Sequence, residues 1–202
     1  MNKREQVPII GSVIAGGFYA GAIRINGQAF ALIVAPQTDG DHAPAIWIDD
    51  YKEVPGAKSY FDGAANTAAM VEAGSALAKW AQALSIGGFT DWYLPAQDEL
   101  EICYRNLKPT AGQNSQYARA GININAIEPT APYSLRAPVQ TPAIAFQEGG
   151  AEAFDAKWYW SSTQRAAGSD YAWCQNFDYG LQGYYGGTYT KLRARAVRRV
   201  AI

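Results

Sequence analysis

The pattern that most restricts the fold lies near the N-terminus. Residues 16–36 read GGFYAGAIRINGQAFALIVAP, in which two runs rich in Ile, Val, Phe and Tyr flank Asn26-Gly27. This pair favours the type I′ turn that joins two antiparallel strands. We therefore predict a β-hairpin here, against which the rest of the chain has to pack.

Helical patterns follow the hairpin. A third strand is predicted over residues 45–48, and from about Asp62 to Leu84 apolar residues recur at spacings of three and four. They are Met70, Ala73, Leu77, Trp80 and Leu84. Gly87-Gly88 is predicted to end this helix, because glycine favours helix C-termini.

A second helix is predicted after Pro95. Residues 92–94 (Trp-Tyr-Leu) resemble a short strand, and Pro95 suits the first position of a helix. Asp98 and Glu99 match the positive N-terminal end of that helix. Its predicted buried stripe is Leu100, Cys103, Tyr104 and Leu107.

The second half of the chain is mostly strands and irregular structure. Residues 108–156 are rich in Pro, Asn, Ser and Gly, so we predict an elaborated loop region that packs across the domain. Strands are predicted over 157–163, 172–177 and 192–200. With no internal repeat and no linker, the pattern indicates one domain of the α+β class, with both helices between two groups of strands.

Composition excludes several classes of protein. With 17 basic and 18 acidic residues the net charge is −1, so general nucleic-acid binding has no electrostatic driving force. No apolar stretch reaches the ~20 residues of a membrane span, and MNKREQVPII does not continue as a signal peptide. Cys103 and Cys174 form neither a metal motif nor a disulfide framework. We expect synthesis in the cytoplasm, no membrane insertion and no nucleic-acid partner.

The segment from Tyr171 to Leu192 has the composition of a binding loop. Four of its tyrosines (Tyr179, Tyr184, Tyr185 and Tyr189) alternate with four glycines (Gly180, Gly183, Gly186 and Gly187). Tyrosine gives broad contact at low entropy cost and small neighbours let the backbone adapt, as in antibody paratopes. The alternative is a surface loop whose tyrosines fold back onto the domain.

Catalytic and metal chemistry have few candidates. His42 is the only histidine, so Ser161 or Ser162 could form a triad only with that residue. Asp39, Asp41 and His42 occupy a turn-rich stretch, where solvation is favoured over metal binding. Trp158, Trp160 and Trp173 are interpreted as core anchors rather than sugar-stacking rings. We expect no metal and no cofactor.

Four segments together resemble a known family. GFTDWYLPAQDEL, WYWSST, AWCQNF and the closing RARAVRR are similar to C-type-lectin-like domains related to the C-terminal domain of bacterial collagen-like (Lcl-type) proteins. The resemblance covers about Gly16 to Val200 and includes phage and prophage variable proteins of diversity-generating retroelements. It implies a C-type-lectin-like fold that displays variable side chains on a fixed scaffold.

The resemblance also implies which positions vary. In retroelement targets, miscopied adenines turn asparagine codons into those for Tyr, Asp, Gly, Ser, Thr, Leu or Cys, but not Gln or Lys. Between Asp178 and Leu192 only Gln182 and Lys191 fall outside the reachable set. The implied ligand-binding positions are Tyr171, Cys174, Asn176, Asp178, Tyr179, Leu181, Gly183, Tyr184, Tyr185, Thr188, Tyr189 and Leu192.

The functional hypothesis is a non-enzymatic receptor-binding protein of phage or prophage type, whose partner is a protein or glycan on a target cell. It would be virion-associated after synthesis. One alternative is a structural tail component that buries the same surface against other tail subunits. A formylglycine-generating type of oxidase would need two reactive cysteines, whereas Cys103 lies on a helix's apolar stripe.

The predicted domain plan is an N-terminal arm over residues 1–15 and a lectin-like domain over 16–202. Residues 1–13 are a candidate attachment or trimerisation arm of a homo-oligomer. Arg193, Arg195 and Arg198 are expected to pair with scaffold carboxylates or carbonyls.

Overall fold

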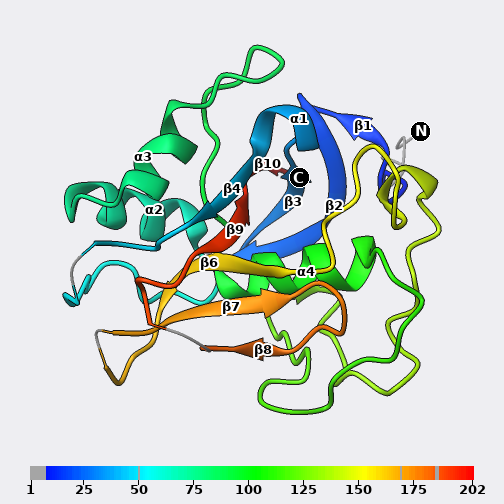
Figure 1. Ribbon diagram of the computed structural model, residues 1–202. Coiled ribbons are helices and arrows are strands. Elements are labelled where there is room, and N and C mark those ends of the chain that lie inside the picture. The colour runs from blue at the N-terminus through cyan, green and yellow to red at the C-terminus, as the bar shows by residue number, and fades with distance from the viewer. Residues whose placement is uncertain (1–7, 50, 169, 185–186) are drawn as a thin grey trace.

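The computed structural model describes residues 8–49, 51–168, 170–184 and 187–202 (Figure 1). The elements are β1 (Val13–Ile14), β2 (Gly17–Ile25), β3 (Gln28–Val34), α1 (Gln37–Gly40), β4 (Asp41–Ala45), α2 (Gly63–Glu72), α3 (Ala76–Ala83), α4 (Gln97–Leu107), β5 (Ala126–Ile127), the 3₁₀ helix η1 (Ile144–Phe146), β6 (Trp158–Gln164), β7 (Ala172–Asn176), β8 (Gln182–Gly183), β9 (Leu192–Arg195) and β10 (Val197–Ala201).

The strands form two sheets. The first has the order β1-β2-β3-β10, with β5 also paired to β2. The second has the order β4-β9-β6-β7-β8, in which only β6 and β9 pair in parallel. Helix α4 runs behind the second sheet in Figure 1, while α2 and α3 lie together to one side. The predicted α+β class is confirmed.

The predicted hairpin is also confirmed. Strands β2 and β3 pair from Ile25↔Gln28 at the turn to Phe18↔Val34 at the open end. Asn26 and Gly27 both have positive φ, +50° and +85°, as a type I′ turn requires.

The two sheets are joined where the chain crosses between them twice. Ala196 separates β9 from β10, so the single strand predicted over 192–200 is divided between the sheets. The Ala196 N–H donates to the Gly40 carbonyl, and the Ala196 carbonyl accepts from the Ala35 N–H. Residues 35–40 carry the chain from β3 to β4, and Ala196 carries it from β9 to β10. These hydrogen bonds therefore join the two connections between the sheets.

The helix predicted over 62–84 is two helices. Gly74, with φ +101°, ends α2 by a conformation that other residues rarely adopt. The Ser75 side chain then caps α3 by accepting from the Ala78 N–H. Of the predicted stripe, Met70 and Leu77 are buried, and Ala73 and Trp80 pack partly buried against the same core. Leu84 is also partly buried, but it packs against the cluster around Ile33 and Trp92.

Four local predictions were wrong, two of them because backbone hydrogen bonds to distant segments decide the structure. The third strand covers 41–45 rather than 45–48, while Trp47 donates its backbone N–H to the Thr188 carbonyl. Residues 92–94 form only an isolated bridge, between Tyr93 and Val197. Residues 87–88 make a tight turn between Ile86 and Phe89, after α3 has already ended. Helix α4 begins at Gln97, two residues later than predicted.

The main core surrounds α4. Its predicted stripe of Leu100, Cys103, Tyr104 and Leu107 is fully buried. These side chains contact Ile23 and Leu32 of the first sheet and Tyr159 of the second sheet. Because the helix packs on both sheets, it fixes the frame on which the C-terminal strands are displayed.

The irregular region over 108–156 packs across the domain, as predicted, and polar side chains of α4 hold it. Arg119 forms an ion pair with Asp98 at 2.6 Å. Glu101 accepts hydrogen bonds from Tyr133 Oη at 2.9 Å and Asn123 Nδ2 at 2.9 Å. Burial raises the pKa of Asp98 and of Glu101. A region with almost no regular structure is thereby tied to the core.

The described part of the predicted N-terminal arm is joined to the domain. Val13 and Ile14 form β1, which pairs with β2. The Gly11 N–H donates to the Tyr19 carbonyl at 2.8 Å. The rest of the arm, residues 1–7, lies outside the described residues. In the part of the chain that is described, no helix is both long and apolar enough to span a bilayer.

Candidate functional site

The predicted binding segment is spread over both ends of the second sheet. The chain runs along β7, turns through residues 177–181, returns as β8 and then loops to β9 (Figure 1). Asp178, Tyr179 and Leu181 therefore lie at one end of β7. Tyr171, Tyr184, Thr188 and Tyr189 belong to the segments at the opposite end. The structure does not bring all the predicted positions onto one patch.

Four predicted positions are buried, which is a correction to the predicted surface. Cys174 directs its thiol to the Gly183 carbonyl, and Gly183 is its cross-strand partner. The Asn176 Oδ1 accepts from the Asp178 and Tyr179 N–H groups and so shapes the turn. The buried positions are Cys174, Asn176, Gly183 and Thr188. In this conformation these four residues are part of the framework of the loops instead of facing a ligand.

The exposed positions gather mainly at one end. We define the tyrosine cluster as Tyr51, Tyr171, Tyr184 and Tyr189, whose exposed fractions are 59%, 37%, 40% and 55%. Tyr189 meets Tyr51 edge-to-face with ring centroids 5.2 Å apart. Tyr184 meets Tyr171 in the same way at 5.9 Å. Partial desolvation, and then the neighbouring Tyr189 and Asp170, raise the pKa of the Tyr51 phenol. Tyr185 lies outside the described residues.

The rings of the tyrosine cluster are braced from behind. Trp173, on β7, meets Tyr184 at 5.5 Å between ring centroids. The Arg165 guanidinium lies 4.1 Å from the centroid of the Tyr184 ring, within the range of a cation–π contact. The Tyr60 ring also contacts Trp173, with 5.8 Å between ring centroids. These contacts hold Tyr184 in one orientation while part of its surface stays exposed.

Backbone hydrogen bonds fix the loop that bears Tyr189. The Thr188 N–H donates to the Asp170 carbonyl at 2.7 Å. The Thr188 carbonyl in turn accepts from the Trp47 N–H at 2.7 Å. This loop is therefore tied both to the segment before β7 and to the segment after β4.

The other end of β7 presents a smaller surface. Tyr179 is exposed on one side and packs edge-to-face on Trp158, with 6.3 Å between ring centroids. Its carbonyl accepts from the Ser115 N–H at 2.7 Å. The Thr110 hydroxyl donates to the Asp178 carbonyl at 2.8 Å. This end is held by the irregular region.

The C-terminal arginines are part of the framework, as predicted. Ion pairs join them to other segments: Arg193–Asp41, Arg193–Asp155, Arg195–Glu152 and Arg198–Asp91. Arg195 is completely buried, and its Nε also donates to the Ala35 carbonyl at 2.9 Å. Desolvation lowers the pKa of Arg195.

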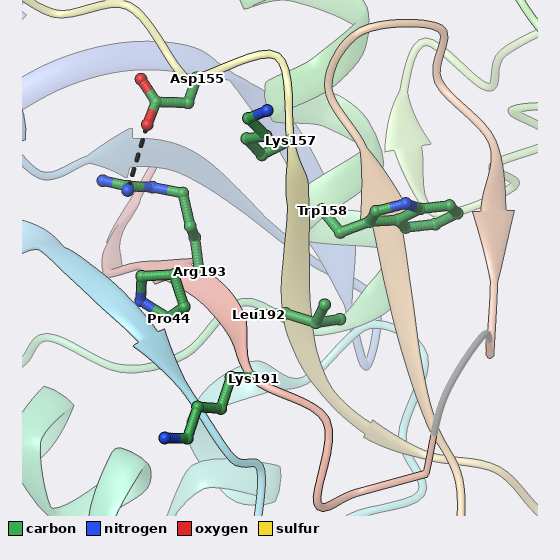
Figure 2. Close-up of a pocket in the computed structure, with 7 residues that line it drawn as sticks. All are labelled: Pro44, Asp155, Lys157, Trp158, Lys191, Leu192 and Arg193. Atoms are coloured by element: carbon green, nitrogen blue, oxygen red, sulfur yellow. Dashed lines mark ion pairs between the residues drawn. The ribbon is translucent and has the colours of Figure 1, made fainter.

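A pocket of about 310 Å³ lies on the second sheet, beside β4, β9 and the start of β6 (Figure 2). Pro44 of β4, Leu192 and Arg193 of β9, and Trp158 of β6 line it together with Asp155, Lys157 and Lys191. Leu192 is the one residue of the predicted binding set that contributes to this lining.

The residues considered for chemistry have structural contacts. His42 lies in β4, rather than in a turn, and packs edge-to-face on Trp80 at 4.6 Å. Ser161 is buried and donates to the Trp173 carbonyl at 2.9 Å. Burial raises the pKa of the Cys103 thiol. Among the described residues, no three His, Cys, Asp or Glu side chains are grouped so as to hold a metal ion.

The tryptophans differ in how far they act as core anchors. Trp160 is completely buried, and its Nε1 donates to the Ala45 carbonyl at 2.9 Å. Trp158 and Trp173 are only partly buried. The latter two lie directly behind exposed tyrosines, so they connect the core to the surface.

Fold and site together define an α+β domain that presents braced tyrosines on a two-sheet frame. Residues 45–198 match the model of the Lcl C-terminal domain. The chain belongs to this family. No curated protein matches the sequence. Among solved structures, a fimbrial protein from Bacteroides ovatus is similar at 13% identity and a TM-score of 0.41. The match covers 83% of this chain and 35% of that protein.

Sequence reasoning missed Tyr51, Tyr60 and Arg165. Tyr51 lies in the connection between β4 and α2, and nothing near it in sequence suggests a ligand. Its contact with Tyr189 depends on how residues 47 and 188 pair. Arg165 directly follows β6. Its position shortly before the Tyr-rich segment is the one feature of the sequence that could have suggested a cation–π contact.

Proposed function

We propose that this chain is a non-enzymatic ligand-binding module whose recognition surface is the tyrosine cluster. The observation that carries the proposal is that Tyr184 is at once exposed and braced by Trp173 and Arg165. Ordering a flexible side chain on binding costs about 0.5–1.5 kcal/mol. A ring that is already held in place avoids part of that cost.

The size and chemistry of the surface support a protein or glycan ligand on a cell surface. Phenol rings offer both an apolar face and a hydroxyl, and aromatic anchors dominate the energetics of many interfaces. The rings of Tyr51 and Tyr189 come from segments far apart in the sequence, so the surface extends beyond a single loop. A ligand that spans it would contact both segments.

The finer proposal is a phage or prophage receptor-binding protein on a C-type-lectin-like scaffold, associated with the virion. Support comes from the positions that are both codon-reachable and exposed, namely Tyr171, Asp178, Tyr179, Tyr184 and Tyr189. Inspection of the flanking DNA tests this directly. A template repeat with adenines at these codons and a neighbouring reverse transcriptase gene would be expected. Uniform drift among close relatives would contradict it.

The absence of catalysis is part of the proposal. Cys103 and Cys174 are buried on different elements, and burial disfavours the reactive thiolate of Cys103. A cysteine-containing substrate peptide is expected to leave an incubation unchanged by mass spectrometry. Oxidation of that peptide by the protein would overturn this part of the proposal.

The binding test compares a double tyrosine variant with a single-tyrosine control. We expect the double variant Tyr184→Ala, Tyr189→Ala to lose at least tenfold in binding to intact bacterial cells and to a glycan array, because each aromatic anchor contributes about 1–2 kcal/mol. A first screen with the labelled wild-type protein identifies the cells and glycans that it binds, and the variants are then measured on these. The control is Tyr117→Ala, which removes a ring that is 79% exposed on the irregular region.

Stability separates recognition from packing. The double variant should melt within a few degrees of the wild type, since both rings are partly in water. Undiminished binding, or a melting temperature lowered by more than about 8 °C, would contradict the proposal. Binding of the wild type to itself instead of to cells, seen as a tyrosine-dependent oligomer, would favour the structural-component alternative.

A further inference from the structure

The pocket on the second sheet combines an apolar centre with two basic ends. Figure 2 shows Lys157 and Lys191 at opposite ends, with Pro44, Leu192 and Trp158 between them. Its volume of about 310 Å³ is at the lower limit of the range for ligand sites. Trp158 also packs on Tyr179, which restrains the indole that forms one wall.

The basic residues of this pocket differ in whether they already form ion pairs within the domain. Arg193 is committed to the framework, because its guanidinium lies 2.7 Å from Asp41 and 3.1 Å from Asp155. Lys157 and Lys191 are exposed, and neither forms an ion pair with any described residue. Two ammonium groups are therefore left to contact a ligand, on either side of apolar side chains.

We propose that this pocket binds an extended acidic peptide segment with an apolar side chain between two carboxylates. In an extended chain, residues i and i+2 face the same way and lie about 6.8 Å apart. The apolar side chain would pack on Leu192 and Trp158, and the two carboxylates would reach Lys157 and Lys191. The site is separate from the tyrosine cluster and does not depend on the proposed function.

The surroundings favour a ligand of few charges over a polyanion. Asp155 stands exposed at the rim, and the chain carries a net charge of −1. A polymer with a negative charge on every unit would meet Asp155 as well as the lysines, and like charges repel. A peptide with two carboxylates can place both on the lysines.

The test uses ¹⁵N-labelled protein and the peptide acetyl-Glu-Gly-Leu-Gly-Glu-amide. We expect saturable shifts of the backbone amide signals of Lys157, Trp158, Lys191 and Leu192. The peptide with Gln at both ends, and the one with Gly in place of Leu, should each bind at least threefold more weakly. Raising NaCl from 50 to 300 mM should weaken the binding of the acidic peptide and leave the binding of the Gln peptide unchanged.

Variants assign the effect to the two lysines. Lys157→Gln and Lys191→Gln should each weaken binding about two- to fivefold, as expected of exposed charge pairs. The control Lys79→Gln changes an exposed lysine of α3 and should bind like the wild type. The Tyr184→Ala, Tyr189→Ala variant should also bind normally, which separates this site from the tyrosine cluster.

Three outcomes would overturn the inference. They are unchanged amide signals with the acidic peptide, equal binding of the Gln peptide, and wild-type binding by the double variant Lys157→Gln, Lys191→Gln. Dextran sulfate serves as the polyanion probe. The proposal of an acidic peptide ligand would be wrong if dextran sulfate bound to the same lysines more tightly than the peptide does. The two ligands are compared at the same concentration of negative charges.

Discussion

Glu99 gives the sharpest test of how the frame is held together. This carboxylate is completely buried in the first turn of α4. Its Oε2 accepts from the Ala96 N–H at 2.8 Å and the Gly63 N–H at 3.1 Å, and its Oε1 accepts from the Tyr93 hydroxyl at 2.7 Å. One side chain thus joins α4, α2 and the segment that bridges to β10.

Burial raises the pKa of Glu99 from 4.5 to about 7, although the hydrogen bonds oppose that shift. The folded state therefore binds the proton more tightly than the unfolded state. Its contribution to stability is complete below pH 4.5 and is lost as the pH rises to 7. A difference of that size corresponds to about 3 kcal/mol in the free energy of unfolding.

Glu99→Gln imitates the protonated acid at every pH. Its amide oxygen can accept the two backbone N–H groups while its amide nitrogen donates to Tyr93 Oη. We expect similar free energies of unfolding for variant and wild type at pH 5, and a variant that is more stable by about 3 kcal/mol at pH 8. Asp41, Asp98 and Glu101 also have raised pKa values, but both proteins contain them.

Urea denaturation between pH 5 and pH 8.5, followed by far-UV circular dichroism, measures this difference. Glu72→Gln, at an exposed position of α2, is the matched control and should show no pH-dependent difference. A Glu99 variant that is destabilised by the same amount at every pH would refute the reasoning. It would mean that the carboxylate is ionised and stabilising throughout this range.

Two further changes test the joints of the fold. Gly74→Ala places a β-carbon at φ +101° between α2 and α3 and should lower the free energy of unfolding by about 1 kcal/mol, measured by urea titration; an unchanged midpoint would show that this joint relaxes freely. Arg195→Met removes the buried partner of Glu152 and a donor to the Ala35 carbonyl, and should cost about 3 kcal/mol. A loss no larger than that of Arg24→Met, at an exposed position of β2, would contradict the framework role of Arg195.

Local chemistry made part of the fold predictable. Asn26-Gly27 encodes its turn within two residues, and the stripe of α4 follows from helical spacing alone. The division of residues 192–200 at Ala196 depends on hydrogen bonds to Ala35 and Gly40, which are far away in sequence. Nothing in the alternation of that segment marks where one sheet ends.

The candidate site was predicted only in part for the same reason. Exposed Tyr184 and Tyr189 follow from a segment without core periodicity. Cys174 and Thr188 are buried because residues 45–48 and 170 pack against their segments, and those contacts are long-range. Tyr51 could be assigned only once its ring was placed against Tyr189.

Oxidative footprinting with mass spectrometry tests the central claim most directly. The protein would be labelled free in solution and again when bound to the cells it recognises. We predict that Tyr51, Tyr171, Tyr184 and Tyr189 lose labelling on binding, while Tyr117 is labelled equally in both states. Protection confined to Tyr117 and the irregular region, with the tyrosine cluster labelled as before, would contradict it.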